Sequence, residues 1–167
     1  MSSNNNCNDK LYRIIIMIML CIIIILVGYI VYDQINEHFN DRDPKLIELK
    51  KKLEFFINSK DKKWTGRLEV LNNRQILNEI KLYVGSKSYT INKTRVYLCL
   101  KDPNNKYYDD NSLMFVLLHE ISHVICNSIG HTDEFHKIFA QVLIEAEKVG
   151  IYNSNIPMIK NYCGHDD

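Results

Sequence analysis

An excess of charge of either sign is missing from this 167-residue sequence, whose 21 basic and 20 acidic residues leave a formal net charge of +1. A dedicated nucleic-acid surface normally needs a net basic face, so we expect no direct nucleic-acid binding. Proline is scarce, at 3 residues, and there is no internal repeat and no glycine-rich phosphate loop. With 46% hydrophobic residues, the composition fits one compact domain with an appended segment.

Paired cysteine motifs are also missing. None of the 5 cysteines forms a CxxC motif, and Cys7 and Cys21 lie outside the expected soluble part. The remaining three, Cys99, Cys126 and Cys163, are too few for a full disulfide framework. Cys99 and Cys126 lie in apolar runs and are interpreted as small core residues, whereas the role of Cys163 stays open.

A long apolar run lies near the N-terminus. Residues 1–10 are polar and asparagine-rich, so we expect a disordered tail there. Residues 11–32 contain an almost unbroken apolar run, long enough to cross a hydrocarbon core of about 30 Å. A cleaved signal peptide is the alternative, but its apolar region is normally shorter and ends at a small-residue cleavage site. The sequence therefore predicts an uncleaved transmembrane anchor, followed by a polar spacer over 33–43.

The charges that flank this segment indicate its orientation. Lys10 and Arg13 lie at its N-terminal side, whereas the first charges after it are acidic, at Asp33, Glu37 and Asp41. The positive-inside rule then places the N-terminus in the cytosol. The expected product is a single-pass membrane protein whose domain over 44–167 is lumenal, extracellular or enclosed in a virus particle.

Helical and strand-like patterns both occur after the spacer, which predicts an α+β fold. An N-cap before proline and a helical apolar spacing mark the first helix of the domain, and β-branched and aromatic residues mark two later strands with a turn near Asn92-Lys93. The expected helices are Pro44 to about Asn58, Asn73 to Val84, a helix capped by Asp110 or Asn111 that runs to about Ser128, and Thr132 to Val149; the expected strands are Trp64 to Leu71, Ser88 to Ile91 and Arg95 to Leu100.

The motif His119-Glu120-Ile121-Ser122-His123 carries the functional prediction. On a helix, His119 and His123 lie one turn apart on one face and can reach one metal ion. Glu120 then occupies the position of the general base in a metalloprotease. Apolar residues flank the motif on both sides, and buried polar side chains in such a helix need a partner. The motif therefore favours a Zn2+ site over a chance match.

A hydrolytic zinc site needs a third protein ligand and leaves its fourth position to water. His131 and His136 are both near enough in sequence to supply it. Gly130 can end the helix at a left-handed turn and bring His131 back toward the metal.

The pattern YLCLKD, then NSLMFVLLHEISHV, then GHTDEFHKIF resembles the WLM and SprT-like zincin metallopeptidases, especially WLM-like proteins of large DNA viruses. The resemblance covers roughly Trp64 to Gly164. It implies a small zincin-like domain with a short, mainly antiparallel sheet before the HExxH helix. It also implies His119, His123 and His131 as zinc ligands, Glu120 as general base and Phe135 packed behind the third ligand. Glu145 and His136 remain alternatives for that third ligand.

The expected function is therefore a membrane-anchored zinc metallopeptidase that hydrolyses peptide bonds with a metal-activated water and a glutamate general base. Its partner is a protein or peptide substrate. Cellular members of the group act on proteins crosslinked to DNA, but this substrate is not carried over, because the chain has an expected anchor and no evident DNA-binding tail. Candidates for a second electrophilic group, by residue type alone, are Tyr97, Tyr152, Tyr162 and His165.

The rival hypothesis is a membrane-anchored structural or interaction protein with a closed or latent zinc site. Structural zinc sites are normally closed by four side chains. A fourth ligand from His136, Cys163 or His165 would favour this reading.

Overall fold

The computed structural model describes residues 3–40, 42–59 and 64–164. The chain divides into an N-terminal unit that ends at Phe39 and a C-terminal unit that begins at Asn40. The two units are described separately.

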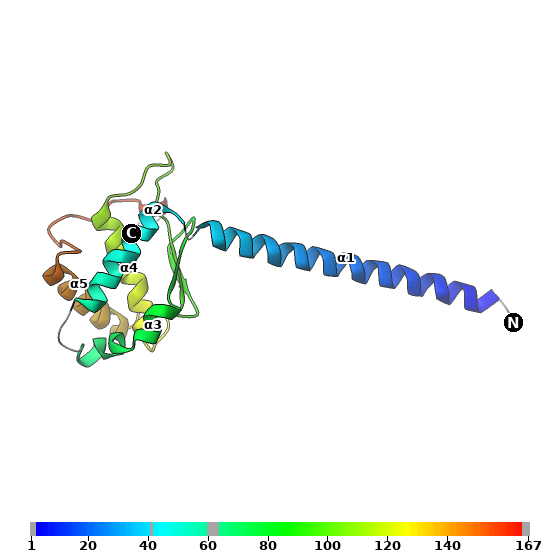
Figure 1. Cartoon of the computed structure of the whole chain (residues 1–167), viewed down its shortest axis with the longest axis horizontal. Helices are drawn as coiled ribbons and strands as arrows, with labels where there is room; N and C mark the ends of the chain where they lie inside the picture. The colour runs from blue at the N-terminus through cyan, green and yellow to red at the C-terminus, as the bar shows by residue number, and fades with distance from the viewer. Residues whose placement is uncertain (1–2, 41, 60–63, 165–167) are drawn as a thin grey trace. The chain divides into compact units, whose positions relative to one another are not determined.

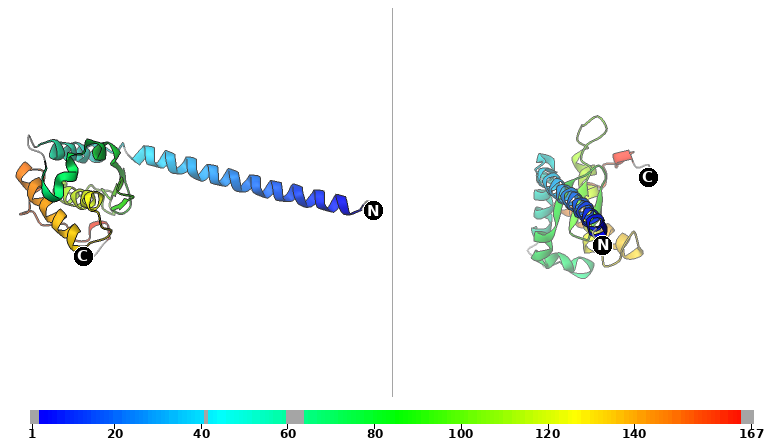
Figure 2. Two further views of the ribbon diagram at one scale, coloured as in Figure 1. Left: turned by 90° about the horizontal axis from the view of Figure 1, so that it is seen from below. Right: turned by 90° about the vertical axis from the view of Figure 1, so that its right-hand side faces the viewer.

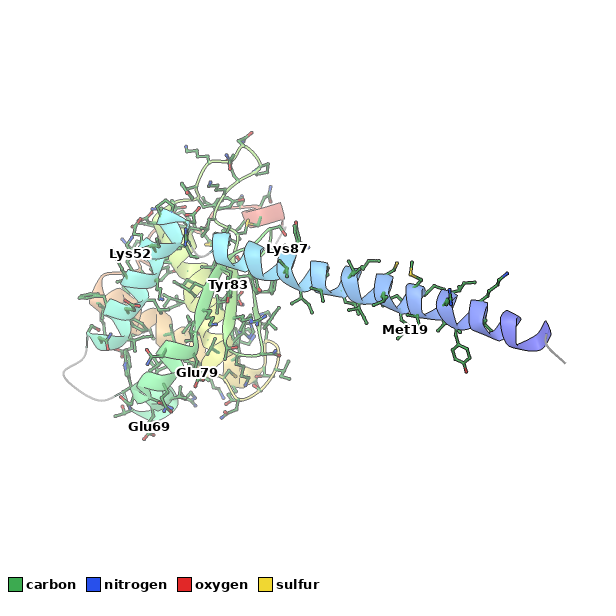
Figure 3. All side chains as sticks on the ribbon, turned by 45° about the vertical axis from the view of Figure 1, so that its right-hand side comes forward. Met19, Lys52, Glu69, Glu79, Tyr83 and Lys87 are labelled. Carbon is green, nitrogen blue, oxygen red and sulfur yellow. A yellow bond between two sulfur atoms is a disulfide. The ribbon has the colours of Figure 1, made fainter. Side chains whose placement is uncertain are left out.

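The N-terminal unit is one long helix, α1, over Ser3–Asn40 (Figures 1 and 2). Its segment Lys10–Tyr32 contains an 18-residue window with a mean hydropathy of 3.4 and is long and apolar enough to cross a membrane. Its 23 residues span about 35 Å as a helix. Apolar side chains such as Met19 project outward along this segment (Figure 3).

Helix α1 is longer than the sequence patterns predict at both ends. It begins at Ser3, within the tail expected to be disordered, and continues through most of the expected spacer to Asn40. The physical reason is that helix nucleation is costly and propagation is not, so the apolar run extends into its flanks. The stretch has no proline, and its one glycine is Gly28.

The C-terminal unit begins with α2, over Pro44–Asn58, as predicted. Asp43 caps the helix by accepting a hydrogen bond from the Lys45 backbone N–H at 2.8 Å, and Pro44 occupies the first helical position. The apolar face of the helix enters the core through Leu46, Leu49, Leu53, Phe56 and Ile57.

The next two predictions were wrong. A 3-10 helix, η1, over Gly66–Asn72 replaces the strand predicted from Trp64. Asn72 closes this segment onto Trp64, because its side chain accepts from the Trp64 N–H at 2.8 Å and donates to the Trp64 carbonyl at 2.7 Å. The helix predicted over Asn73 to Val84 is instead a short helix, α3, over Arg74–Glu79, followed by strand β1 over Lys81–Val84.

The sheet has three strands in the order β1-β3-β2. Strand β2, Tyr89–Ile91, pairs antiparallel with β3, Arg95–Leu98, through the turn predicted at Asn92-Lys93. Strand β3 pairs parallel with β1, so the expectation of a mainly antiparallel sheet was wrong. The chain reverses once before β2 and once after it, so β3 runs in the direction of β1 and inserts beside it. Strand β2 is left at the edge.

Two further helices complete the unit. Helix α4, Asp110–Ile125, is capped by Asp109, one residue before the predicted caps, and is buried over most of its surface. Helix α5, Asp133–Val149, begins at the Thr132 cap and ends at Gly150, which has φ +79. A short 3-10 turn, η2, follows over Tyr162–Gly164.

A disulfide joins Cys99, just after β3, to Cys163 in η2. Cys99 is a buried core residue, as predicted, but its sulfur is also bonded to Cys163, the cysteine whose role was open, and this bond was not predicted. Cys126 is a free, buried core residue, as predicted. The bridge ties the C-terminal stretch to the end of the sheet.

Candidate active site

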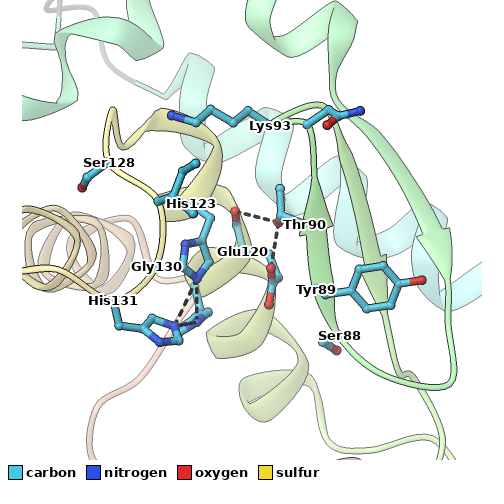
Figure 4. Close-up of a pocket in the computed structure, with 12 residues that line it drawn as sticks. Ser88, Tyr89, Thr90, Lys93, Glu120, His123, Ser128, Gly130 and His131 are labelled. Carbon is cyan, nitrogen blue, oxygen red and sulfur yellow. Dashed lines mark hydrogen bonds between the residues drawn. The ribbon is translucent and has the colours of Figure 1, made fainter.

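Three histidine side chains meet at one point of the C-terminal unit. His119 and His123 lie one turn apart on α4. His131 comes from the loop between α4 and α5 and lies beside His123 (Figure 4). The three Nε2 atoms form a triangle with edges of 3.0, 3.1 and 3.2 Å. The structure thus brings together the three side chains named from the motif and the resemblance.

The loop that delivers His131 differs in one detail from the expectation. Helix α4 ends at Ile125, before Gly130 is reached. Gly130 has φ +81 and turns the chain directly before His131, so its left-handed conformation serves the loop and not the helix end. Lys93 from the β2–β3 turn donates to the backbone carbonyls of Cys126 and, at 2.9 Å, Asn127, and so stabilises the C-terminus of α4.

Hydrogen bonds among the three Nε2 atoms cannot all be formed at once. Each Nε2 atom of a neutral imidazole is either a donor or an acceptor, never both. In a ring of three such atoms, at least one contact therefore joins two donors or two acceptors. Three lone pairs directed at one shared cation remove the conflict. Tetrahedral zinc, with Zn–N bonds of about 2.0–2.1 Å, places its nitrogen ligands about 3.3 Å apart, so the observed edges fit such an ion.

Burial favours the neutral form of His119 and His123. Desolvation, with a smaller contribution from the neighbouring histidines, lowers the pKa of His119 to about 4. The pKa of His123 is also lowered, mainly by burial. Neutral imidazole is the form that binds a metal.

Phenylalanine side chains support the cluster from one side. Phe135 is 1% exposed, and its ring stacks on His123 with centroids 4.2 Å apart. The same ring lies 4.9 Å from His131, where the resemblance implies that it packs. Phe139 contacts the His119 ring at 5.1 Å. These contacts fix the orientation of the imidazole rings.

Glu120 lies beside the triangle and faces strand β2. It is 5% exposed, and its carboxylate accepts a 2.7 Å hydrogen bond from the Thr90 hydroxyl (Figure 4). The same hydroxyl lies 3.2 Å from the Glu120 backbone carbonyl. Burial raises the pKa of Glu120, and the bond from Thr90 opposes that rise. A buried carboxylate with a raised pKa next to three ligand-type nitrogens is suited to proton transfer.

The alternative third ligands lie outside the triangle. His136 is exposed, and its ring centroid is 6.3 Å from that of His131. Glu145 lies on α5 and accepts a hydrogen bond from Lys148 at 3.0 Å. Among the side chains that the structure describes, His119, His123 and His131 form the one group of potential ligands close enough to share an ion.

Of the tyrosines considered as a second electrophilic group, Tyr162 lines a cavity at the histidine cluster and Tyr97 and Tyr152 do not. Tyr162 lines a cavity beside Glu120, and its hydroxyl donates to the Cys99 carbonyl and lies 3.2 Å from the Ser88 hydroxyl. Burial raises the pKa of Tyr162 to about 12. Tyr97 stacks between two tyrosines of the sheet, and Tyr152 packs near Phe115. His165 lies outside the described residues.

Two cavities meet at the cluster and share Ser88, His119, Glu120 and His131. The first, of about 520 Å³, lies between edge strand β2 and the loop that carries His131. The second, of about 590 Å³, lies between α4 and the C-terminal segment. The histidines and Glu120 thus lie in the middle of a continuous cleft.

Three contributors to this site were missed by sequence reasoning. Thr90, Ser88 and the Cys99–Cys163 bridge all depend on contacts between segments far apart in sequence. The alternation of Tyr89, Thr90 and Ile91 in a strand was a usable signal, since it places Thr90 on the face opposite its two apolar neighbours. The alternation does not predict which element packs against the face that carries Thr90.

Comparison with known proteins finds relatives in viruses. An uncharacterized protein of Invertebrate iridescent virus 6 is 52% identical over 105 residues, which cover 61% of this chain and 59% of the relative. An uncharacterized protein of Invertebrate iridescent virus 3 is 48% identical over 99 residues, or 59% of this chain and 62% of the relative. An uncharacterized protein of Acanthamoeba polyphaga mimivirus is 33% identical over 92 residues, or 51% of this chain and 46% of the relative.

The chain therefore spans about half to three fifths of the length of the curated relatives it matches. No family model matches the chain, and no solved structure matches it. The chain is similar to viral proteins, and a chemical function has to be argued from the site.

Proposed function

We propose that this chain is a membrane-anchored zinc metallopeptidase of the WLM and SprT-like type, with a protein or peptide substrate. One observation carries the proposal: three Nε2 atoms lie within 3.2 Å of one another, with the buried carboxylate of Glu120 beside them in an open cleft. The HExxH motif and the resemblance quoted above support the same reading.

His119, His123 and His131 would hold Zn2+. The ion would act as a Lewis acid that polarises the substrate carbonyl and lowers the pKa of water. Glu120 accepts a proton from the attacking water and delivers it to the leaving amine. Thr90 holds the carboxylate of Glu120 in place through its 2.7 Å hydrogen bond. The open edge of β2 offers backbone groups to an extended substrate, which can bind as an added strand.

The test compares the full-length chain with its Glu120→Gln variant in detergent micelles. Zinc content is measured by mass spectrometry, and turnover is measured on an unfolded protein substrate. We expect about one zinc per chain in both proteins and a loss of at least about 100-fold in turnover in the variant, in the range of a lost general base. His119→Ala is the control that loses both zinc and turnover. Full activity of Glu120→Gln would exclude the proposed mechanism.

The rival, a closed structural zinc site, needs a fourth protein ligand. Cys163 is bonded to Cys99, and His136 lies outside the triangle, so two of the three candidates for that ligand are engaged or distant. X-ray absorption at the zinc edge separates the two hypotheses. Three imidazole ligands, recognised by the scattering of their outer ring atoms, and one oxygen ligand without such a ring support the peptidase, whereas four protein ligands support the rival.

We also propose that the N-terminus of the chain is cytosolic and that the C-terminal unit lies on the other side of the membrane. Two independent features support this orientation: the basic residues Lys10 and Arg13 before the candidate span, and a disulfide after it. Disulfides persist in oxidising compartments and are rare in the cytosol. Protection of the C-terminal unit from added protease in sealed microsomes is the expected result.

A further inference from the structure

We propose that the cavity between α4 and the C-terminal segment is a specificity subsite that receives a large apolar side chain of the substrate, always on the same side of the cleaved bond. This inference rests on the proposed peptidase function. It adds the class of substrate residue that the site prefers.

Apolar and aromatic side chains line this cavity from two elements. Phe115 and Val116 contribute from α4, and Met158, Ile159 and Tyr162 contribute from the C-terminal segment, which also brings the polar residues Lys160 and Asn161. The cavity is also lined by His119, Glu120 and His131, so a side chain in it belongs to a residue next to the bond at the histidine cluster. The volume of about 590 Å³ is ample for a leucine or phenylalanine side chain.

The outer wall of the cavity is held in place at several points. Cys163 is bonded to Cys99, and its N–H donates to the Tyr108 hydroxyl at 3.0 Å. The Tyr162 ring lies 4.7 Å from that of Tyr108, and its hydroxyl binds the Cys99 carbonyl. The Ile159 N–H donates to the Ser112 hydroxyl at 3.4 Å. A wall fixed in this way can select a side chain, because little ordering is left to occur on binding.

The other half of the cleft is built differently. It is lined by Asn92 and Lys93 from the β2–β3 turn, by Ser128 and Ile129 from the loop, and by Tyr89 of β2. Tyr89 and Ile129 are 42% and 91% exposed. The wall that the Cys99–Cys163 disulfide holds in place lies on the α4 side of the cleft, so selection for an apolar residue is expected chiefly on that side of the cleaved bond.

An extended peptide is the occupant that this geometry favours. The cavity opens onto the cleft that runs past edge strand β2, where an added strand would present alternate side chains to the same face. One such side chain points toward α4 and its apolar wall. The favourable free energy of transferring an apolar side chain from water to the cavity is the source of the preference for such residues.

The experiment measures peptide binding separately from cleavage. The full-length Glu120→Gln chain, loaded with zinc in detergent micelles, is titrated into two labelled peptides of alanine and serine that differ at one central residue, leucine or aspartate. Fluorescence anisotropy gives the two dissociation constants. We expect the leucine peptide to bind at least about tenfold more tightly, the scale of discrimination by an apolar pocket. Equal affinities would overturn the subsite.

A matched pair of variants locates the effect. Ile159 and Ile156 are both exposed, at 37% and 45%, and lie in the same segment, but Ile159 lines the cavity and Ile156 does not. Ile159→Asn should reduce the preference for leucine by about fivefold, the value for loss of part of an aliphatic contact surface. Ile156→Asn should leave it unchanged. Equal effects of the two variants would contradict the placement of the subsite.

Cleavage by the wild-type chain then separates the two proposals. If an unfolded protein is cut, the cleaved bonds should share a large apolar residue on one side, and a random distribution would overturn the subsite. If binding favours leucine but nothing is cut, the subsite stands as a peptide-binding site and the peptidase function fails.

Discussion

The disulfide should contribute much of the stability of the C-terminal unit. Cys99 and Cys163 are 64 residues apart in sequence, and their bridge closes one long loop. The chain-entropy relation gives about 4 kcal/mol for a loop of this length, within the usual range of about 2–5 kcal/mol for removal of a native disulfide. The double variant Cys99→Ala Cys163→Ala should lower the free energy of unfolding by that amount.

The measurement can use the single tryptophan as its reporter. Trp64 is 5% exposed, packs on Phe56 with ring centroids 5.2 Å apart and donates to the Ile57 carbonyl at 3.1 Å. Its fluorescence reports unfolding of the C-terminal unit alone, because α1 contains no tryptophan. Urea titration of the full-length chain in a mild detergent then gives the free energy of unfolding.

The control is Cys21→Ser, which removes a free, exposed cysteine of α1 and should leave the Trp64 transition unchanged. Reduction of the wild-type chain should reproduce the effect of the double variant. A loss below about 1 kcal/mol in both cases would refute the reasoning, since it is less than the low end of the usual range.

Three other predictions follow from single contacts. Thr90→Val should reduce kcat by about 10- to 100-fold with little change in KM, because a hydrogen bond to a charged group contributes about 1.5–3 kcal/mol, whereas Thr90→Ser should restore most of the activity. His131→Ala should lower zinc affinity, measured by competition with a chelator, and His136→Ala should not; the reverse order would contradict the assignment. Asp110 accepts bonds from two lysines, chiefly Lys45, which lower its pKa. Because its side chain is 50% exposed, Asp110→Asn should cost at most about 1 kcal/mol at pH 7, and urea titrations should show this cost shrinking as the pH falls below about 4.

Local patterns were sufficient for the helices that carry the site. The Asp43-Pro44 cap and the apolar spacing after it predicted α2, and α4 and α5 followed from the same kind of pattern. The i, i+4 spacing of His119 and His123 is a property of any helix, so their proximity was also predictable. These features depend on neighbours within one or two turns.

Features that depend on distant segments were not predictable in the same way. Strand β1 was read as part of a helix, because its pairing with β3 decides its conformation and the sequence of four residues does not. The bond between Thr90 and Glu120 needs the register of β2 against β3 and the packing of α4 on the sheet. The partner of Cys99 could not be found by spacing, because 64 residues separate it from Cys163.

The compartment of the C-terminal unit and the shape of its cleft are linked through the same disulfide. In a reducing cytosol, Cys99 and Cys163 would be thiols, and the covalent attachment of the wall that carries Ile159 and Tyr162 would be lost. The preference for an apolar residue should then weaken, although the histidine triangle contains no cysteine and would keep its zinc. Measurement of peptide preference and zinc content before and after reduction tests this directly. A preference that survives reduction unchanged would show that the noncovalent contacts of Ile159, Tyr162 and Cys163 are sufficient to hold the wall.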